Sequence, residues 1–413
     1  MKLITSLGTN TYKEATYVWG EKQCRTNMFT DAVVKWLKPQ TVLVLLTKEA
    51  EDTNWPILRE KLNRHRVAVQ TLRIPDGRNE AEVWEIFDAV TQQIHEEERL
   101  VIDITHAFRS LQFVLFVVSA FLRAVKRVEI QHVLYGLHQQ GQSSDTPSPV
   151  MDLRLMLDLL DWMEGVRRFQ ELGDARFIGE TLQRTQDDIY RKDATTEGSK
   201  PTTLKTAGKE LLALSDSLQA LRVVDVMRSA RKLVSITEKA IHEAQIWVKP
   251  FALLIDRVRQ MAVQLAHEKP DELNFDTLEK QMHTVRALVQ YRQFVQALLL
   301  QREWLLNYVM WRINREKNWL HHDSRREVEN FLNQGVKAVE DKQDPNLSAL
   351  DKYMGQDEIR DVVQLWSKIV DPRNDFAHCG MRQHTQTPDD LRQKATEFAQ
   401  QLKNLLESAK AQF

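Results

Sequence analysis

The sequence predicts two domains of different fold class: a doubly wound α/β domain at residues 1–142, followed by an all-helical domain at residues 150–413. Three observations predict this division. Short apolar runs alternate with helical patterns in the first third of the chain. The later part instead repeats apolar residues at three- and four-residue spacing. A polar, proline-bearing segment at residues 141–149 separates the two patterns.

Five apolar runs in the first domain are predicted to form a parallel sheet. They lie at residues 3–7, 42–46, 67–72, 100–104 and 128–134, with helical patterns at 27–37, 54–65, 80–97 and 110–125. Their lack of polar alternation is typical of strands covered on both faces. We expect the strand order 3-2-1-4-5, which is common in such domains. The long connection from Thr9 to Arg25 carries aromatic residues and suggests a small hairpin or flap.

Amphipathic patterns in the second domain predict a helix bundle, with no convincing strand after residue 149. The predicted helices lie at residues 153–168, 204–247, 251–267, 278–315, 325–342 and 358–370. An aromatic stripe at Trp304, Tyr308, Trp311 and Trp319 lies beside several arginines and could stack on single-stranded RNA. A buried core stripe with a basic flank is the preferred interpretation.

Composition and charge limit the possible classes of protein. The 413 residues are 42% hydrophobic and 28% charged, as is ordinary for a soluble protein. The net charge of −1 argues against broad, non-specific binding to nucleic acid or to an anionic membrane. Cys24 and Cys379 are the only cysteines, so neither a disulfide framework nor a zinc spacing is expected. Without a signal peptide or a transmembrane-length apolar run, we expect a cytoplasmic protein that makes no membrane contact.

Two polar clusters follow the first and fourth predicted strands, which are neighbours in the expected order. The candidate ligand-binding residues are Gly8, Thr9, Asn10, Thr105, His106, Arg109 and Ser110. Hydroxyls, an amide, a histidine, an arginine and a helix N-terminus together suit phosphates and ribose. Isolated turn and capping roles are the alternative for each residue alone. A dinucleotide would require G-x-G-x-x-G where Gly8 stands alone, so no NAD or FAD cofactor is expected. His321 and His322 could suggest a metal, but the sequence specifies no partner carboxylate, so no metal site is expected.

A second candidate site is the segment D-P-R-N-D-F-A-H at residues 371–378. We expect Asp371 to cap a helix that begins at Pro372, which places Arg373 and Asn374 in a first turn suited to phosphate. Arg373 and His378 diverge by roughly 140° on a helix, so one copy forms half a site. Two copies related by a two-fold axis could complete it. A surface helix start with a half-buried histidine is the alternative.

These motifs resemble those of a known family. S-L-G-T-N at residues 6–10 with D-I-T-H-A-F-R-S at residues 103–110 resembles the sensor domain of CRISPR-associated CARF proteins, in the branch with a D-x-T-H-G motif. Ala107 stands where that motif has Gly. R-N-D-F-A-H at residues 373–378 resembles the RNase motif of HEPN domains. Both motifs in this order resemble the CARF–HEPN ribonucleases of type III CRISPR systems.

The resemblance implies a Rossmann-like CARF domain followed by a helical HEPN-type domain, in a homodimer or a higher assembly of dimers. The implied activator is a cyclic oligoadenylate, with cyclic tetra-adenylate expected, and the implied activity is metal-independent cleavage of single-stranded RNA in antiviral defence. His378 would be the general acid/base, Arg373 would neutralise the phosphorane and Asn374 would orient the histidine or the phosphate. A ligand-responsive transcription regulator and a catalytically inactive sensor or scaffold are the alternatives.

Overall fold

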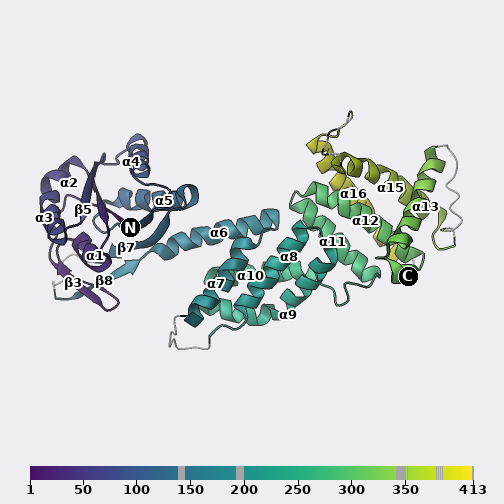
Figure 1. The fold of residues 1–413 in the computed structure, drawn as a ribbon, viewed down its shortest axis with the longest axis horizontal. Helices are drawn as coiled ribbons and strands as arrows, with labels where there is room; N and C mark the ends of the chain where they lie inside the picture. Colours follow the sequence, from purple (N-terminus) through teal and green to yellow (C-terminus); the bar gives the residue numbers. More distant parts are fainter. Residues whose placement is uncertain are drawn as a thin grey trace. The chain divides into compact units, whose positions relative to one another are not determined.

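The computed structural model describes residues 1–137, 145–191, 200–340, 350, 352–377, 379, 381, 383 and 385–411. The chain forms two compact units, Met1–Asp161 and Trp162–Phe413 (Figure 1). The first unit is α/β and the described part of the second is helical, which confirms the two predicted fold classes. The units divide within helix α6 (Arg154–Leu172), downstream of the polar segment at which the sequence predicted the boundary.

An eight-stranded sheet forms the centre of the first unit, with the order β3-β2-β8-β7-β6-β1-β4-β5 among the described residues. Its strands are β1 (Lys2–Ser6), β2 (Ala15–Trp19), β3 (Lys22–Thr26), β4 (Thr41–Leu46), β5 (Ala68–Arg73), β6 (Arg99–Asp103), β7 (Glu129–Gly136) and β8 (Pro147–Asp152). Strands β5, β4, β1, β6 and β7 are parallel neighbours. They are the five strands predicted from the sequence, and their observed order is the predicted 3-2-1-4-5.

Helices cover both faces of the sheet. Alternate residues of β1 and β4 enter two cores: Leu3 and Val42 pack with α1 (Phe29–Leu37) and α3 (Trp55–His65), whereas Ile4 and Leu43 pack with α4 (Glu80–Gln92) and α5 (Arg109–Lys126). A short helix, α2 (Lys48–Thr53), precedes α3. Because successive side chains of a strand point to opposite faces, this division confirms the doubly wound arrangement.

The antiparallel pair β2–β3 confirms the hairpin expected between Thr9 and Arg25. Strand β8 shows that the expectation of no strand after residue 149 is wrong. It pairs antiparallel with β7 and parallel with β2. Its sequence, P-S-P-V-M-D, contains two prolines and no apolar run, so it gives no local strand signal, and one of its two partners, β2, is more than 100 residues away.

The second unit is built from helices packed around two cores. After α6 they are α7 (Arg176–Arg191), α8 (Leu204–Gln219), α9 (Val223–Trp247), α10 (Lys249–Leu265), α11 (Phe275–Gln290), α12 (Phe294–Arg312), the 3₁₀ helix η1 (Glu316–Asn318), α13 (His322–Glu340), α15 (Gln356–Ala377) and α16 (Pro388–Lys410). Two helices predicted as continuous are each broken, at Leu221 and at Arg292, which have φ of 56° and 57°. Trp304, Tyr308 and Trp319 are buried, which confirms the interpretation of the aromatic stripe as core.

Candidate functional site

The two predicted polar clusters of the α/β unit meet at one edge of its sheet. Strands β1 and β6 are parallel neighbours in which Thr5 is paired with Asp103, so their carboxyl ends lie side by side. From β1 the chain continues to α1 on one face, and from β6 it continues to α5 on the other. This edge is therefore the topological switch point, where ligands bind in doubly wound folds.

A buried carboxylate, that of Asp103, fixes the backbone around this edge. Its Oδ2 accepts hydrogen bonds from the hydroxyls of Thr5 at 2.9 Å and Thr30 at 2.8 Å, and its Oδ1 accepts one from the N–H of Thr105 at 2.9 Å. The side chain thus joins β1, α1 and the turn after β6. Asp103 is the first residue of the D-I-T-H-A-F-R-S motif, and no role was predicted for it from the sequence.

His106 lies in that turn as a neutral hydrogen-bonding group. Its Nε2 accepts a hydrogen bond from the backbone N–H of Phe29 at 3.1 Å, which leaves the ring proton on Nδ1. Its ring lies 3.9 Å from that of Tyr12, centroid to centroid. Burial lowers the pKa of His106 to about 4, although the charge of Asp103 opposes this. At neutral pH its Nδ1–H can therefore donate a hydrogen bond, but the ring brings no positive charge to a phosphate.

The loop after β1 is held against the same turn. The N–H of Gly8 donates to the hydroxyl of Tyr12 at 2.7 Å, while Nδ2 of Asn54 donates to the carbonyls of Gly8 at 2.8 Å and Asn10 at 2.9 Å. A Cβ at Gly8 would lie 3.0 Å from the carbonyl oxygen of His106, so any larger residue would push the two turns apart by a few tenths of an ångström. Asn54 and the hydroxyl of Tyr12 were not predicted. The aromatic content of the connection was the only sequence signal for Tyr12.

The remaining predicted ligand-binding residues have different surroundings. Thr105 accepts a hydrogen bond at its Oγ1 from the N–H of Gly136 at 2.9 Å, which ties the turn to β7. Thr9, Asn10 and Ser110 are exposed. Arg109 begins α5, and its side chain lies outside the described part of the structure. The structure thus brings Gly8, Thr105 and His106 together and leaves three polar residues near them open to solvent.

The predicted helix start at Asp371 is wrong. Helix α15 runs without interruption from Gln356 to Ala377, so Arg373 and Asn374 lie in its last turn instead of a first turn. That end of a helix carries the negative pole of the dipole and does not attract phosphate. The helix buries Ile359, Val362, Val363, Trp366 and Ile369, all of which precede Asp371. Proline inside a helix removes one backbone hydrogen bond, and α15 continues past Pro372 in spite of that loss.

The side chains of Arg373 and Asn374 lie outside the described residues, and so does His378. Their predicted catalytic roles stay predictions. Within the described ranges, no group of three or more His, Cys, Asp or Glu side chains is placed to hold a metal ion. None of the helices in the described part of the chain is both long and apolar enough to cross a membrane.

Comparison with known proteins finds similarity to CRISPR-associated proteins. The family described as "CRISPR-associated protein MJ1674, second domain" matches residues 158–263. CRISPR-associated protein MJ1674 of Methanocaldococcus jannaschii is 26% identical over 141 residues, which make up 32% of this chain and 22% of that protein. The chain thus covers only about a fifth of its relative's length. Both findings support an association with CRISPR, the coarser part of the predicted resemblance. The family match covers much of α6 to α10, separate from the edge at β1 and β6 and from α15.

Proposed function

We propose that the chain is a CRISPR-associated ribonuclease controlled by a small ligand. In this proposal the α/β unit binds a cyclic oligoadenylate, with cyclic tetra-adenylate the first candidate, and the helical unit cleaves single-stranded RNA without a metal ion. The observation that carries the proposal is the meeting of the Gly8 loop and the His106 turn at the switch point of the sheet. The similarity to CRISPR-associated proteins supports it independently.

The chemistry at this edge suits a nucleotide ring. Neutral His106 offers an uncharged donor at Nδ1, which suits an acceptor atom of ribose or adenine. The exposed side chains of Thr9, Asn10 and Ser110 add hydroxyl and amide groups. Phosphates would be neutralised by the first-turn N–H groups of α5 together with Arg109, the first residue of that helix.

An apolar surface of the α/β unit supports the proposed dimer. Phe113, Val117 and Val125 lie on one face of α5 at spacings of four and eight residues, and their exposed fractions are 75%, 57% and 58%. Such a stripe is unfavourable in water and suits an interface between two copies. Under two-fold symmetry, two ligand-binding edges could contact one ring of matching symmetry.

The proposed reaction needs acid–base chemistry and one positive charge. The 2′-hydroxyl of a ribose loses its proton and attacks the adjacent phosphorus, and the 5′-oxygen takes up a proton and leaves. The products are a 2′,3′-cyclic phosphate and a 5′-hydroxyl. His378 would transfer the protons, and Asn374 would orient it or the phosphate. Because Arg373 lies at the carboxyl end of α15, its own charge has to stabilise the phosphorane without help from the helix dipole.

Arg373 lies at the carboxyl end of α15, where the helix dipole does not help to bind phosphate. This position favours a second candidate, a sensor whose helical unit recruits partners without cleaving RNA. One experiment distinguishes the two. Isothermal titration with cyclic tetra-adenylate measures binding, and a fluorescent RNA assay in EDTA measures cleavage. Binding with cleavage supports the ribonuclease, and binding without cleavage supports the recruiting sensor. Failure to bind the ring or any other cyclic oligoadenylate would overturn both.

A further inference from the structure

A groove in the helical unit lies between α6, α10 and α11, and neither site described above includes it. Its volume is ≈ 630 Å³, within the range of roughly 300–1,000 Å³ typical of ligand sites. Its lining on α10 and α11 includes the polar and charged residues Arg257, Gln260, Gln264, His283, Arg286 and Gln290.

These side chains form two stripes that line one groove. Residues 257, 260 and 264 of α10 are spaced by three and four, and so are residues 283, 286 and 290 of α11. This spacing places each set on one face of its helix. Their order is Arg-Gln-Gln on one wall and His-Arg-Gln on the other. Both walls therefore combine positive charge with side-chain amides.

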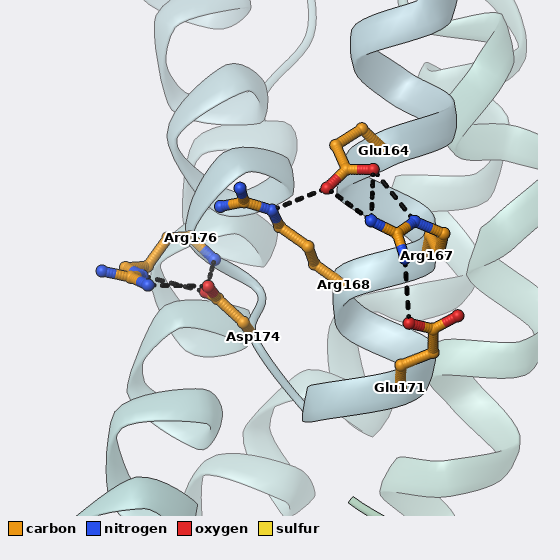
Figure 2. Close-up of polar contacts among 6 residues, drawn as sticks. All are labelled: Glu164, Arg167, Arg168, Glu171, Asp174 and Arg176. Carbon is orange, nitrogen blue, oxygen red and sulfur yellow. Dashed lines mark hydrogen bonds and ion pairs between the residues drawn. The ribbon is translucent and has the colours of Figure 1, made fainter. Parts of the chain in front are cut away.

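The two arginines of the groove differ from their neighbours on α6. Figure 2 shows Arg167 in contact with Glu164 and Glu171, and Arg168 in contact with Glu164, at 2.9–3.1 Å. By contrast, the structure gives the guanidinium groups of Arg257 and Arg286 no hydrogen bond or ion pair with any described residue. Both residues are exposed and remain able to bind an anion.

The groove is locally positive. The described lining residues include two arginines and a histidine but no carboxylate. Burial, together with the nearby charges of Lys280 and Arg286, lowers the pKa of His283 against the opposing charge of Glu279. The whole chain has a net charge of −1, so this groove is a local feature of an otherwise balanced protein.

We infer that the groove binds the phosphate backbone of single-stranded RNA, with Arg257 and Arg286 contacting phosphates and the glutamine amides contacting bases or ribose. Guanidinium groups match phosphate oxygens, and an amide can donate to and accept from the exposed edges of unpaired bases. The inference rests on the proposed function, because it assigns the helical unit a place that holds the substrate strand. An acidic peptide is the competing ligand, because its carboxylates could pair with the same arginines. RNA is favoured because the proposed function supplies an RNA strand to the helical unit.

The test is fluorescence anisotropy with fluorescein-labelled oligouridine and the full-length protein carrying His378→Ala, so that no RNA is consumed. The variant pair Arg257→Ala and Arg286→Ala is compared with Arg167→Ala and Arg259→Ala. This control pair removes the same charge from two exposed arginines that contact carboxylates. A third protein carries Arg257→Lys and Arg286→Lys, which keeps the charge.

The groove variant is expected to bind RNA about tenfold more weakly or worse, since hydrogen bonds between arginine and phosphate are charge-assisted. The plot of log affinity against log salt has a negative slope, and its magnitude should decrease by about 1.4 in the groove variant. This corresponds to about 0.7 for each of the two phosphates that the protein no longer neutralises. The lysine variant should keep the slope, and the control pair should bind like the parent protein. Far-ultraviolet circular dichroism checks that all variants fold.

The inference is overturned if the groove variant keeps the parent affinity and slope, or if the control pair weakens binding as much. It is also overturned if polyglutamate displaces the probe more effectively than unlabelled RNA. Failure of the groove inference can be distinguished from failure of the proposed function. A protein that binds RNA in the groove and never cleaves it contradicts the proposed ribonuclease activity alone. Unchanged RNA binding by the groove variant, in a protein whose parent cleaves RNA, contradicts the groove alone.

Discussion

The imidazole Nε2 of His106 lies 3.1 Å from the backbone nitrogen of Phe29, whose N–H donates to it. This contact joins the turn after β6 to the first residue of α1, and it can form only while Nε2 carries no proton. The protonation state of one side chain is thereby coupled to the packing of the proposed ligand-binding edge.

The first prediction concerns that protonation state. His106 should titrate with a pKa of about 4, because burial penalises its charged form. Between that value and the ordinary pKa of about 6.5 for a free histidine, the unfolded chain binds more protons than the folded one. The free energy of unfolding should therefore decrease as the pH falls through this window. The measurement is the pH dependence of the His106 ring signals by NMR, assigned with His106→Gln. A midpoint near 6.5 would contradict this prediction.

The second prediction concerns Gly8. In Gly8→Ala the new Cβ would lie 3.0 Å from the His106 carbonyl oxygen and 3.1 Å from the Tyr12 hydroxyl. The loop must shift, at an expected cost of about 1–3 kcal/mol in the free energy of unfolding, and binding of cyclic tetra-adenylate should weaken. Chemical denaturation and isothermal titration measure the two effects. Gly355→Ala is the control, since its Cβ would meet no atom within 4 Å. Equal behaviour of the two variants would show that the close approach at Gly8 is unimportant.

The third prediction concerns the buried carboxylate of Glu243, which caps the start of α8. It accepts hydrogen bonds from the N–H and hydroxyl groups of Thr202 and Thr203 at 2.7–3.0 Å and from the N–H of Leu204 at 3.2 Å. We expect Glu243→Ala to lower the free energy of unfolding of the helical unit by about 1–2 kcal/mol, as measured by denaturant titration. Glu238→Ala, at a site 83% exposed, should have little effect and is the control.

The same carboxylate predicts a pH dependence. Burial alone would raise the pKa of Glu243, but the hydrogen bonds from Thr202 and Thr203 outweigh it and lower the pKa. Its contribution to stability is therefore present above the unfolded pKa and is lost as the pH falls through the folded value. The difference in unfolding free energy between the parent protein and Glu243→Ala should shrink in acid. A difference that stays constant down to pH 3 would rule out this linkage.

The fourth prediction concerns the apolar face of α5. Replacing Phe113 and Val117 with serine should raise the dissociation constant of the dimer, because both side chains are largely exposed in the single chain. Light scattering over a dilution series measures the change. Ile57→Ser, which alters a partly exposed apolar residue on α3, is the control. If the double variant and the control dissociate alike, α5 is not the interface.

The parallel sheet and its edge could be predicted because local patterns determine them. Buried strands read as apolar runs, and the position of polar residues after each run identified the loops around Gly8 and His106. The partners of those loops could not be predicted in the same way. Asn54 contacts the carbonyl of Gly8 from 46 residues away in the sequence, and no periodicity connects the two.

The errors in the helical unit all concern where helices begin and end, which local sequence signals predict least well. A capping aspartate and a proline predicted a helix start at Asp371, but α15 already begins at Gln356, buries an apolar face before Asp371 and ends at Ala377. Conversely, uninterrupted apolar spacing predicted single helices across Leu221 and Arg292, where the backbone turns into the left-handed region without glycine.

The decisive measurement for a ligand-controlled ribonuclease is cleavage of a fluorescent single-stranded RNA in EDTA, with and without cyclic tetra-adenylate. We expect that the ligand stimulates cleavage and that the products end in cyclic phosphates. A hundredfold stimulation would require about 2.7 kcal/mol of coupling, which lies within the usual range. His378→Ala should bind the ligand and leave the RNA intact, whereas Arg109→Ala should no longer be stimulated. Strict dependence on added Mg²⁺, or wild-type cleavage by His378→Ala, would contradict the proposed function.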